Sequence, residues 1–116
     1  MSAIALALQI PLGVNAQIGH LASEVTRLVN QPGFWGGCAA RMIPDITTTA
    51  GLEGCNPNYV TFDCDGTTGV LTKSQSTVMF SNAQLSMVAG YRYYVKVDPT
   101  VMLNGVCLAV RSDALP

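Results

Sequence analysis

The sequence predicts a mainly β domain of the α+β class. It is expected to be an antiparallel β-sandwich or small barrel with one N-terminal amphipathic helix and an extended apolar N-terminal arm. The second half of the chain alternates apolar and polar residues between turn signals, which is typical of strands. Residues 15–30 instead repeat apolar side chains at helical spacing. The length of 116 residues fits one domain, and hydrophobic residues reach 49%, so there is enough apolar material for a core.

Residues 1–13 form the predicted arm. Ile4, Leu6, Leu8 and Ile10 alternate with small or polar residues, which is a strand pattern. Such an arm can add to the sheet edge of a neighbouring subunit, or it can be the first strand of its own sheet. It is far shorter than the roughly 20 residues of a membrane span, so we predict no span. Because no Lys or Arg precedes Arg27, we interpret it as mature sequence rather than a signal peptide.

Residues 14–116 are expected to form a single β-rich domain that begins with a helix at about residues 15–30. Asn15 can cap this helix, and Pro32 with Gly33 can end it. The apolar stripe consists of Ile18, Leu21, Val25 and Leu28.

An irregular loop is predicted at residues 31–58, where glycine and proline are frequent. Loops of this length are usually functional or held by neighbours. The loop carries the only tryptophan, Trp35, which follows Phe34 and lies among glycines. Tryptophan is favoured at interface hot spots, although it can equally plug the end of a sheet. We predict that Phe34 and Trp35, with the four arm residues, contact neighbouring subunits.

Short strands are expected from Tyr59 onward. Turn signals stand at Asp65 with Gly66, at Asp98 with Pro99 and at Asn104 with Gly105. The first of these predicts a turn at a strand end that opens a β-hairpin. The predicted strands lie at residues 60–64, 70–72, 77–81, 85–89, 91–97 and 106–110, and 91–97 shows the clearest alternation.

The four cysteines are Cys38, Cys55, Cys64 and Cys107, and they allow three disulfide pairings. Cys64 and Cys107 lie in predicted strands and can pair across the core, while Cys38 and Cys55 can tie the loop. The alternative is four free thiols in a cytosolic protein, which act as small hydrophobes.

No catalytic, metal or cofactor site is predicted. The cysteines form no C-x-x-C pair, and Asp63, Asp65 and Gly66 depart from the calcium-loop spacing. Only His20 and Cys38 offer a base and a nucleophile, and nothing in the sequence brings them together. We therefore expect that the protein is not an enzyme. The net charge of −1 and the lack of a Lys/Arg cluster predict no nucleic-acid partner.

Charged residues make up only 11% of the chain, against about 25% in typical proteins. Surfaces poor in charge are typical of interface cores, so we expect a structural subunit of a large assembly, and a homo-oligomer. Its partners would be copies of itself and a major structural protein.

A short, charge-poor, β-rich chain with an apolar arm resembles the small decoration (cement) proteins of tailed-phage capsids. This resemblance implies a minor virion protein, made in the host cytoplasm, that covers seams between neighbouring subunits.

The order of a helix at residues 15–30, strands after Tyr59, and Cys64 with Cys107 resembles the globular part of bacterial type IV pilins. The long apolar helix of pilins is broken here by Pro11 and Gly13. This second resemblance implies a secreted or surface-exposed binding or pilin-like module with two disulfides, located outside the cell or on its surface.

Overall fold

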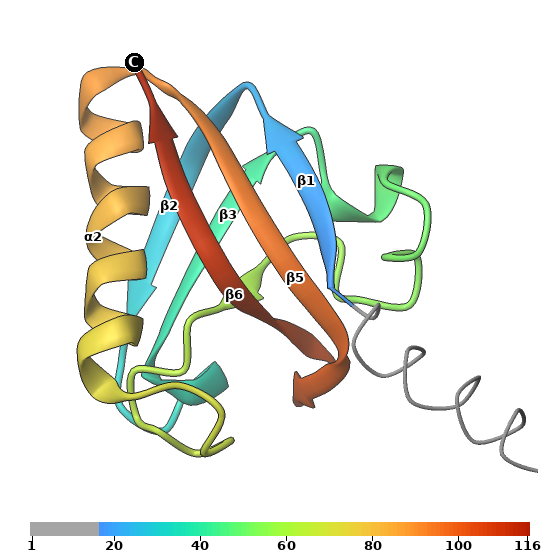
Figure 1. The fold of residues 1–116 in the computed structure, drawn as a ribbon, viewed down its shortest axis with the longest axis vertical. Coiled ribbons are helices and arrows are strands. Elements are labelled where there is room, and N and C mark those ends of the chain that lie inside the picture. The colour runs from blue at the N-terminus through green and yellow to red at the C-terminus, as the bar shows by residue number, and fades with distance from the viewer. Residues whose placement is uncertain (1–16) are drawn as a thin grey trace, which may run out of the picture.

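The computed structural model of the chain describes residues 17–116 (Figure 1). One curled sheet of six strands is covered on one side by a long helix. Two short 3-10 turns, Trp35–Gly37 and Ile46–Thr48, lie in the connections. The strands and the helix are β1 Ile18–Ala22, β2 Glu24–Asn30, β3 Cys38–Ile43, β4 Val60–Thr61, α2 Lys73–Ala89, β5 Arg92–Leu103 and β6 Val106–Leu115.

The strand order is β1-β5-β6-β4-β3-β2, and the pairs are antiparallel except for β4 with β6. The mainly β prediction is confirmed, but the strands form one mixed sheet rather than a purely antiparallel sandwich or barrel. Only Ser23 separates β1 from β2, although these strands lie at opposite ends of the strand order. The sheet therefore curls until its two edges come together at Ser23.

Residues 18–30 form β1 and β2, so the helix predicted at about residues 15–30 is wrong over this range. His20 and Ala22 are buried while Leu21 between them is 51% exposed, which is the two-residue period of a strand. At Gly19 an added Cβ would lie 2.1 Å from the Tyr94 hydroxyl, so a larger residue there would displace the Tyr94 ring. The helix followed by strands, on which the resemblance to pilins depends, is thus not found among residues 17–116.

The region predicted as an irregular loop, residues 31–58, contains strand β3, which lies between β2 and β4. Its sequence, CAARMI, has small residues in place of the β-branched residues that usually indicate a strand. Ala39 and Ala40 are fully buried because β2 and β4 flank them closely.

Helix α2 occupies the region where the sequence suggested strands at residues 77–81 and 85–89. Thr72 and Gln75 form a capping box at its start, and Gly90 at φ +72° ends it. Apolar residues lie all round the helix, so no single stripe indicates the helical period in the sequence. The buried face consists of Ser76, Met79, Phe80, Ala83 and Ser86.

The β5–β6 hairpin confirms the turn predicted at Asn104 and Gly105, which have φ values of +54° and +84°. The turn predicted at Asp98 with Pro99 is instead an irregularity inside β5, where the register shifts between Asp98 and Met102. Asp98 Oδ1 accepts hydrogen bonds from the backbone N–H and hydroxyl of Thr100 there.

Helix α2 packs between β6 and β2 and covers part of the space that the two-residue strand β4 leaves open (Figure 1). Asn82 Nδ2 donates to the Ser112 carbonyl at 2.8 Å, and Ser112 Oγ donates to the Met79 carbonyl at 2.9 Å. Burial raises the pKa of the Tyr93 hydroxyl. Because the one hydrogen of Ser112 Oγ goes to Met79, the Tyr93 hydroxyl donates to Ser112 Oγ. These bonds fix the helix to β6.

Candidate functional site

Two surfaces stand out among the described residues: the aromatic loop at Phe34 and Trp35, and the outward side of α2. The predicted interface residues of the arm, Ile4, Leu6, Leu8 and Ile10, lie outside the described residues.

Phe34 and Trp35 follow β2 and begin the 3-10 turn before β3. Their rings stack with centroids 4.2 Å apart, and Trp35 lies 4.7 Å from the ring of Tyr59. Phe34 is 39% exposed, whereas Trp35 is half-buried against Ala39 and Val106. Trp35 thus packs over the sheet near the start of β3, and the Phe34 ring is the more exposed to solvent of the two. Their contact with a neighbouring subunit stays a prediction.

The glycines of this loop are required by backbone conformation and by space. Gly36 has φ +78°, and a Cβ there would lie 2.7 Å from Leu103 Cδ1 and 3.1 Å from Asp63 Cα. A Cβ on Gly37 would lie 2.5 Å from Asp65 Oδ1. Asp65 closes the loop further, because its Oδ2 accepts from the Gly33 N–H at 2.8 Å and its own N–H donates to the Gly36 carbonyl.

A shallow pocket of about 260 Å³ opens beside this loop. Phe34, Trp35 and Leu103 give it an apolar wall, and Asp65, Thr67 and Asn104 supply polar groups. It lies just below the roughly 300–1,000 Å³ of typical ligand sites, and its one carboxylate is already engaged by Gly33.

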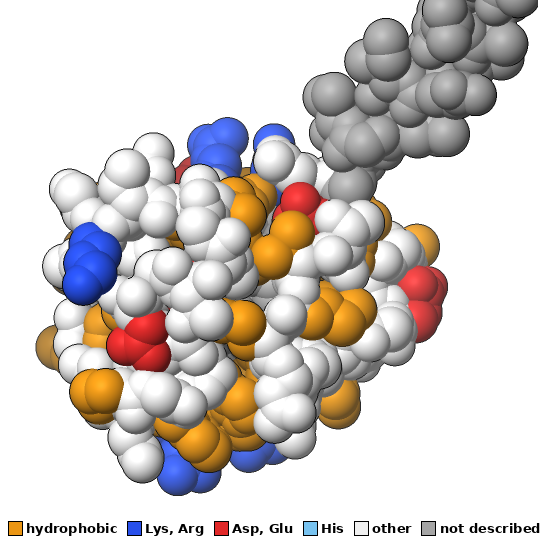
Figure 2. Space-filling model, turned by 90° about the horizontal axis from the view of Figure 1, so that it is seen from below, with side chains coloured by type: hydrophobic (Ala, Val, Ile, Leu, Met, Phe, Trp, Pro, Cys, Tyr) orange, Lys and Arg blue, Asp and Glu red, His pale blue; other side chains and the backbone are white. Residues whose placement is uncertain are grey.

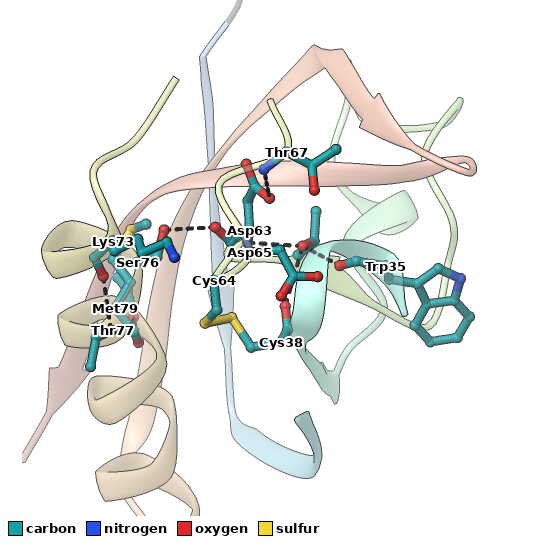
Figure 3. The surroundings of a disulfide bond; sticks show 12 residues. Trp35, Cys38, Asp63, Cys64, Asp65, Thr67, Lys73, Ser76, Thr77 and Met79 are labelled. Carbon is teal, nitrogen blue, oxygen red and sulfur yellow. Dashed lines mark hydrogen bonds between the residues drawn. A yellow bond between two sulfur atoms is a disulfide. The ribbon is translucent and has the colours of Figure 1, made fainter. Parts of the chain in front are cut away.

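Asp63 is the hydrogen-bonding centre behind the loop (Figure 3). It is fully buried at φ +54°, and its carboxylate accepts from the backbone N–H groups of Thr67 and Thr68, both at 2.8 Å. Its carbonyl accepts from Ser76 Oγ of α2 at 3.1 Å. The predicted turn at Asp65 with Gly66 is therefore present, but it leads from β4 toward α2 and opens no hairpin.

All four cysteines are paired, Cys38 with Cys64 and Cys55 with Cys107. The pairing considered from the sequence, Cys64 with Cys107, is wrong, and the thiols are not free. Cys38–Cys64 joins the start of β3 to the Asp63 turn, and in Figure 3 the Trp35 ring points away from it. Cys55–Cys107 ties the long connection after β3 to β6, beside the hydrogen bond from the Asn56 N–H to the Gly105 carbonyl.

His20 and Cys38, the base and nucleophile considered from the sequence, form no catalytic pair. His20 is buried, with Nδ1 2.8 Å from Thr49 Oγ1 and Nε2 2.8 Å from the Pro44 carbonyl, while Cys38 is held in its disulfide. Between residues 17 and 116, no cluster of three or more His, Cys, Asp or Glu side chains could hold a metal ion.

The outward side of α2 is the second surface, and it was missed because the helix was predicted as strands. Lys73 is the only charged residue among the 17 residues of the helix. Val78, Leu85 and Val88 are 57%, 49% and 83% exposed, and we call these three the α2 apolar face. The capping box from Thr72 to Gln75 was the sequence signal that could have revealed it.

Charge is sparse on the described surface as well. In the view of Figure 2, the acidic and basic side chains are few, and most of the face is uncharged or apolar. Arg111 and Asp113 form the one ion pair found in residues 17–116, at 2.9 Å.

No family model, curated protein or solved structure matches this chain. Of the helices that the structure describes, none is long and apolar enough to cross a membrane.

Proposed function

We propose that this protein is a non-enzymatic structural subunit that works outside the cytoplasm and assembles with other subunits through the α2 apolar face. It is a secreted or surface-exposed module that its two disulfides stabilise.

The observation that carries the proposal is the α2 apolar face. Val88 is 83% exposed, Leu85 lies one turn before it, and Val78 lies two turns before Leu85 on the same side of the helix. They form an apolar strip, interrupted by the exposed Ser81, on a helix with one charge. Exposed large apolar side chains on one side of a helix are typical of interaction sites, and charge is depleted at interface cores. Burying this strip on a neighbour would remove apolar area from water at about 25 cal/mol per Å².

The two disulfides support a location outside the cytoplasm. Disulfides persist in oxidising environments and are rare in the cytosol. Both bonds join segments far apart in sequence, with separations of 26 and 52 residues, as structural disulfides do.

A second candidate is a virion decoration protein that covers seams between capsid subunits. The charged content of 11% supports this candidate too, because a surface so poor in charge suits permanent burial in an assembly. A fold made in a reducing host cytoplasm would have to form its disulfides later, so we place this candidate second.

The test is light scattering of the oxidised protein over a range of concentrations. We expect species larger than a monomer for the natural chain. The variant Leu85→Lys/Val88→Lys should be monomeric, since it places two charges in the proposed interface.

The matched control is Thr77→Lys/Gln84→Lys, which adds the same charges at exposed positions on the flank of the same helix. The control should assemble as the natural chain does. Equal assembly of the two double variants, or a natural chain that is monomeric at every concentration, would contradict the proposal.

A further inference from the structure

A groove of about 360 Å³ runs between α2 and β6, beside the α2 apolar face. Its volume lies within the range of roughly 300–1,000 Å³ that binding pockets occupy. Val78 belongs both to this groove and to the α2 apolar face. The groove lining includes Leu71, Ser74, Val78 and Met79 on one side and Val110 and Ser112 on the other.

The groove is electrically neutral. Its α2 side carries hydroxyl, amide and aliphatic groups only. Arg111 also borders it, but this guanidinium pairs with Asp113 at 2.9 Å and lies 5.5 Å from the centre of the Tyr94 ring. The groove therefore suits an occupant without charge.

Strand β6, which forms one side of the groove, has no neighbouring strand on the edge that faces the groove. β4 pairs with β6 only through Cys107 and Leu108, so β6 from Ala109 onward has β5 on one side and α2 on the other. An extended segment can dock along a strand edge that lacks a strand partner. Asn82 of α2 already donates to the Ser112 carbonyl here, so the apolar lining of the groove, rather than strand pairing, would hold such a segment.

We propose that the arm of a second copy, residues 1–13, occupies this groove. The inference rests on the proposed function, because it names the segment that joins the subunits. The sequence has no Asp, Glu, Lys, Arg or His before His20, so the arm matches the neutral groove. Its alternation places Ile4, Leu6, Leu8 and Ile10 on one side of an extended chain, where they would meet Leu71, Val78 and Val110.

The position of β1 favours a second copy over the same chain. Ile18 pairs with Val97 of β5, and β5 separates β1 from β6. The described chain begins just before Ile18, on the far side of the β5–β6 hairpin from the groove, so the groove of a second copy is the simpler site for the arm. Two copies that exchange arms reciprocally close a dimer, and copies that each pass their arm to the next build rings or filaments.

The experiment uses two full-length variants. Leu6→Glu/Leu8→Glu places charges in the arm and leaves the groove intact, and Ser74→Glu/Val78→Glu places charges in the groove and leaves the arm intact. Each alone should associate at least about tenfold more weakly than the natural chain, since an unpaired carboxylate in an apolar groove is strongly unfavourable. Mixed together, they should form a two-chain species that grows no further, because only one arm and one groove remain competent.

Circular dichroism and non-reducing mass establish that each variant is folded and oxidised, and Thr77→Glu/Gln84→Glu is the matched control that should assemble normally. An arm variant that assembles like the natural chain overturns the inference, as does a mixture in which no two-chain species forms. If the arm variant assembles while Leu85→Lys/Val88→Lys does not, assembly through the α2 apolar face stands and the arm does not occupy the groove.

If the natural chain is monomeric at every concentration, both the proposed assembly and the docking of the arm are wrong.

Discussion

At the scale of single residues, a position can require glycine because its φ is positive or because there is no space for a side chain. Gly36 meets both conditions and Gly66 only the first. Both have positive φ, +78° and +74°. A Cβ on Gly36 would press on Leu103 and on the backbone of Asp63, whereas a Cβ on Gly66 would meet nothing within 4 Å. The two positions therefore form a matched pair.

We expect Gly66→Ala to lower the free energy of unfolding by about 1–2 kcal/mol, the cost of a left-handed conformation for a residue with a side chain. Gly36→Ala should cost roughly 1–3 kcal/mol more, because it also overpacks the loop. Urea unfolding of the oxidised proteins measures both values. Equal losses would show that the loop yields to the extra methyl group, and would contradict the close packing at Asp63.

At the scale of elements, α2 depends on its first turn. Thr72 Oγ1 accepts from the Gln75 N–H at 3.1 Å, and Gln75 Oε1 accepts from the Thr72 N–H at 2.8 Å. Thr77 lies one turn further along, where its hydroxyl donates to the Lys73 carbonyl and faces solvent.

Thr72→Ala should therefore destabilise the protein by about 1 kcal/mol, since it removes the cap. Thr77→Ala, the same substitution within the helix, should leave stability unchanged or raise it by a few tenths of a kcal/mol, because alanine has the higher helix propensity. Thermal or urea unfolding compares the two. A Thr77→Ala loss as large as that of Thr72→Ala would refute the role of the capping box.

At the scale of the whole molecule, the two disulfides hold a sheet with a two-residue central strand. Cys38–Cys64 and Cys55–Cys107 flank β4 from both sides, through β3 and β6. By the chain-entropy relation, their separations of 26 and 52 residues correspond to roughly 3.5 and 4 kcal/mol.

Replacing either pair with alanine should lower the free energy of unfolding by roughly 3–4 kcal/mol, a large part of the 5–15 kcal/mol of a typical domain. The reduced natural chain should lose most of its stability. Urea unfolding with and without a thiol reductant tests this, and intact mass should be two hydrogens lower for each bond present. Equal stability of the reduced and oxidised chains would contradict a structural role for the disulfides.

The sequence by itself determined what local chemistry controls. The alternation of Tyr93, Val95 and Val97 placed β5, and Asn104 with Gly105 placed the hairpin turn, because both depend on neighbouring residues alone. The capping box and Gly90 made α2 predictable too, but apolar residues on every side of the helix concealed its period. The interaction surface that low charge predicts stays a prediction.

Only the tertiary structure decided the rest. The apolar spacing of Ile18, Leu21 and Val25 fits a helix, but pairing with β5 and β3, distant in sequence, makes these residues strands. The partner of each cysteine also follows from strand order, since β4 brings β3 beside β6 and no spacing along the chain records that neighbourhood. The groove exists for the same reason: a strand of two residues leaves an edge of β6 open, and α2 covers only part of it.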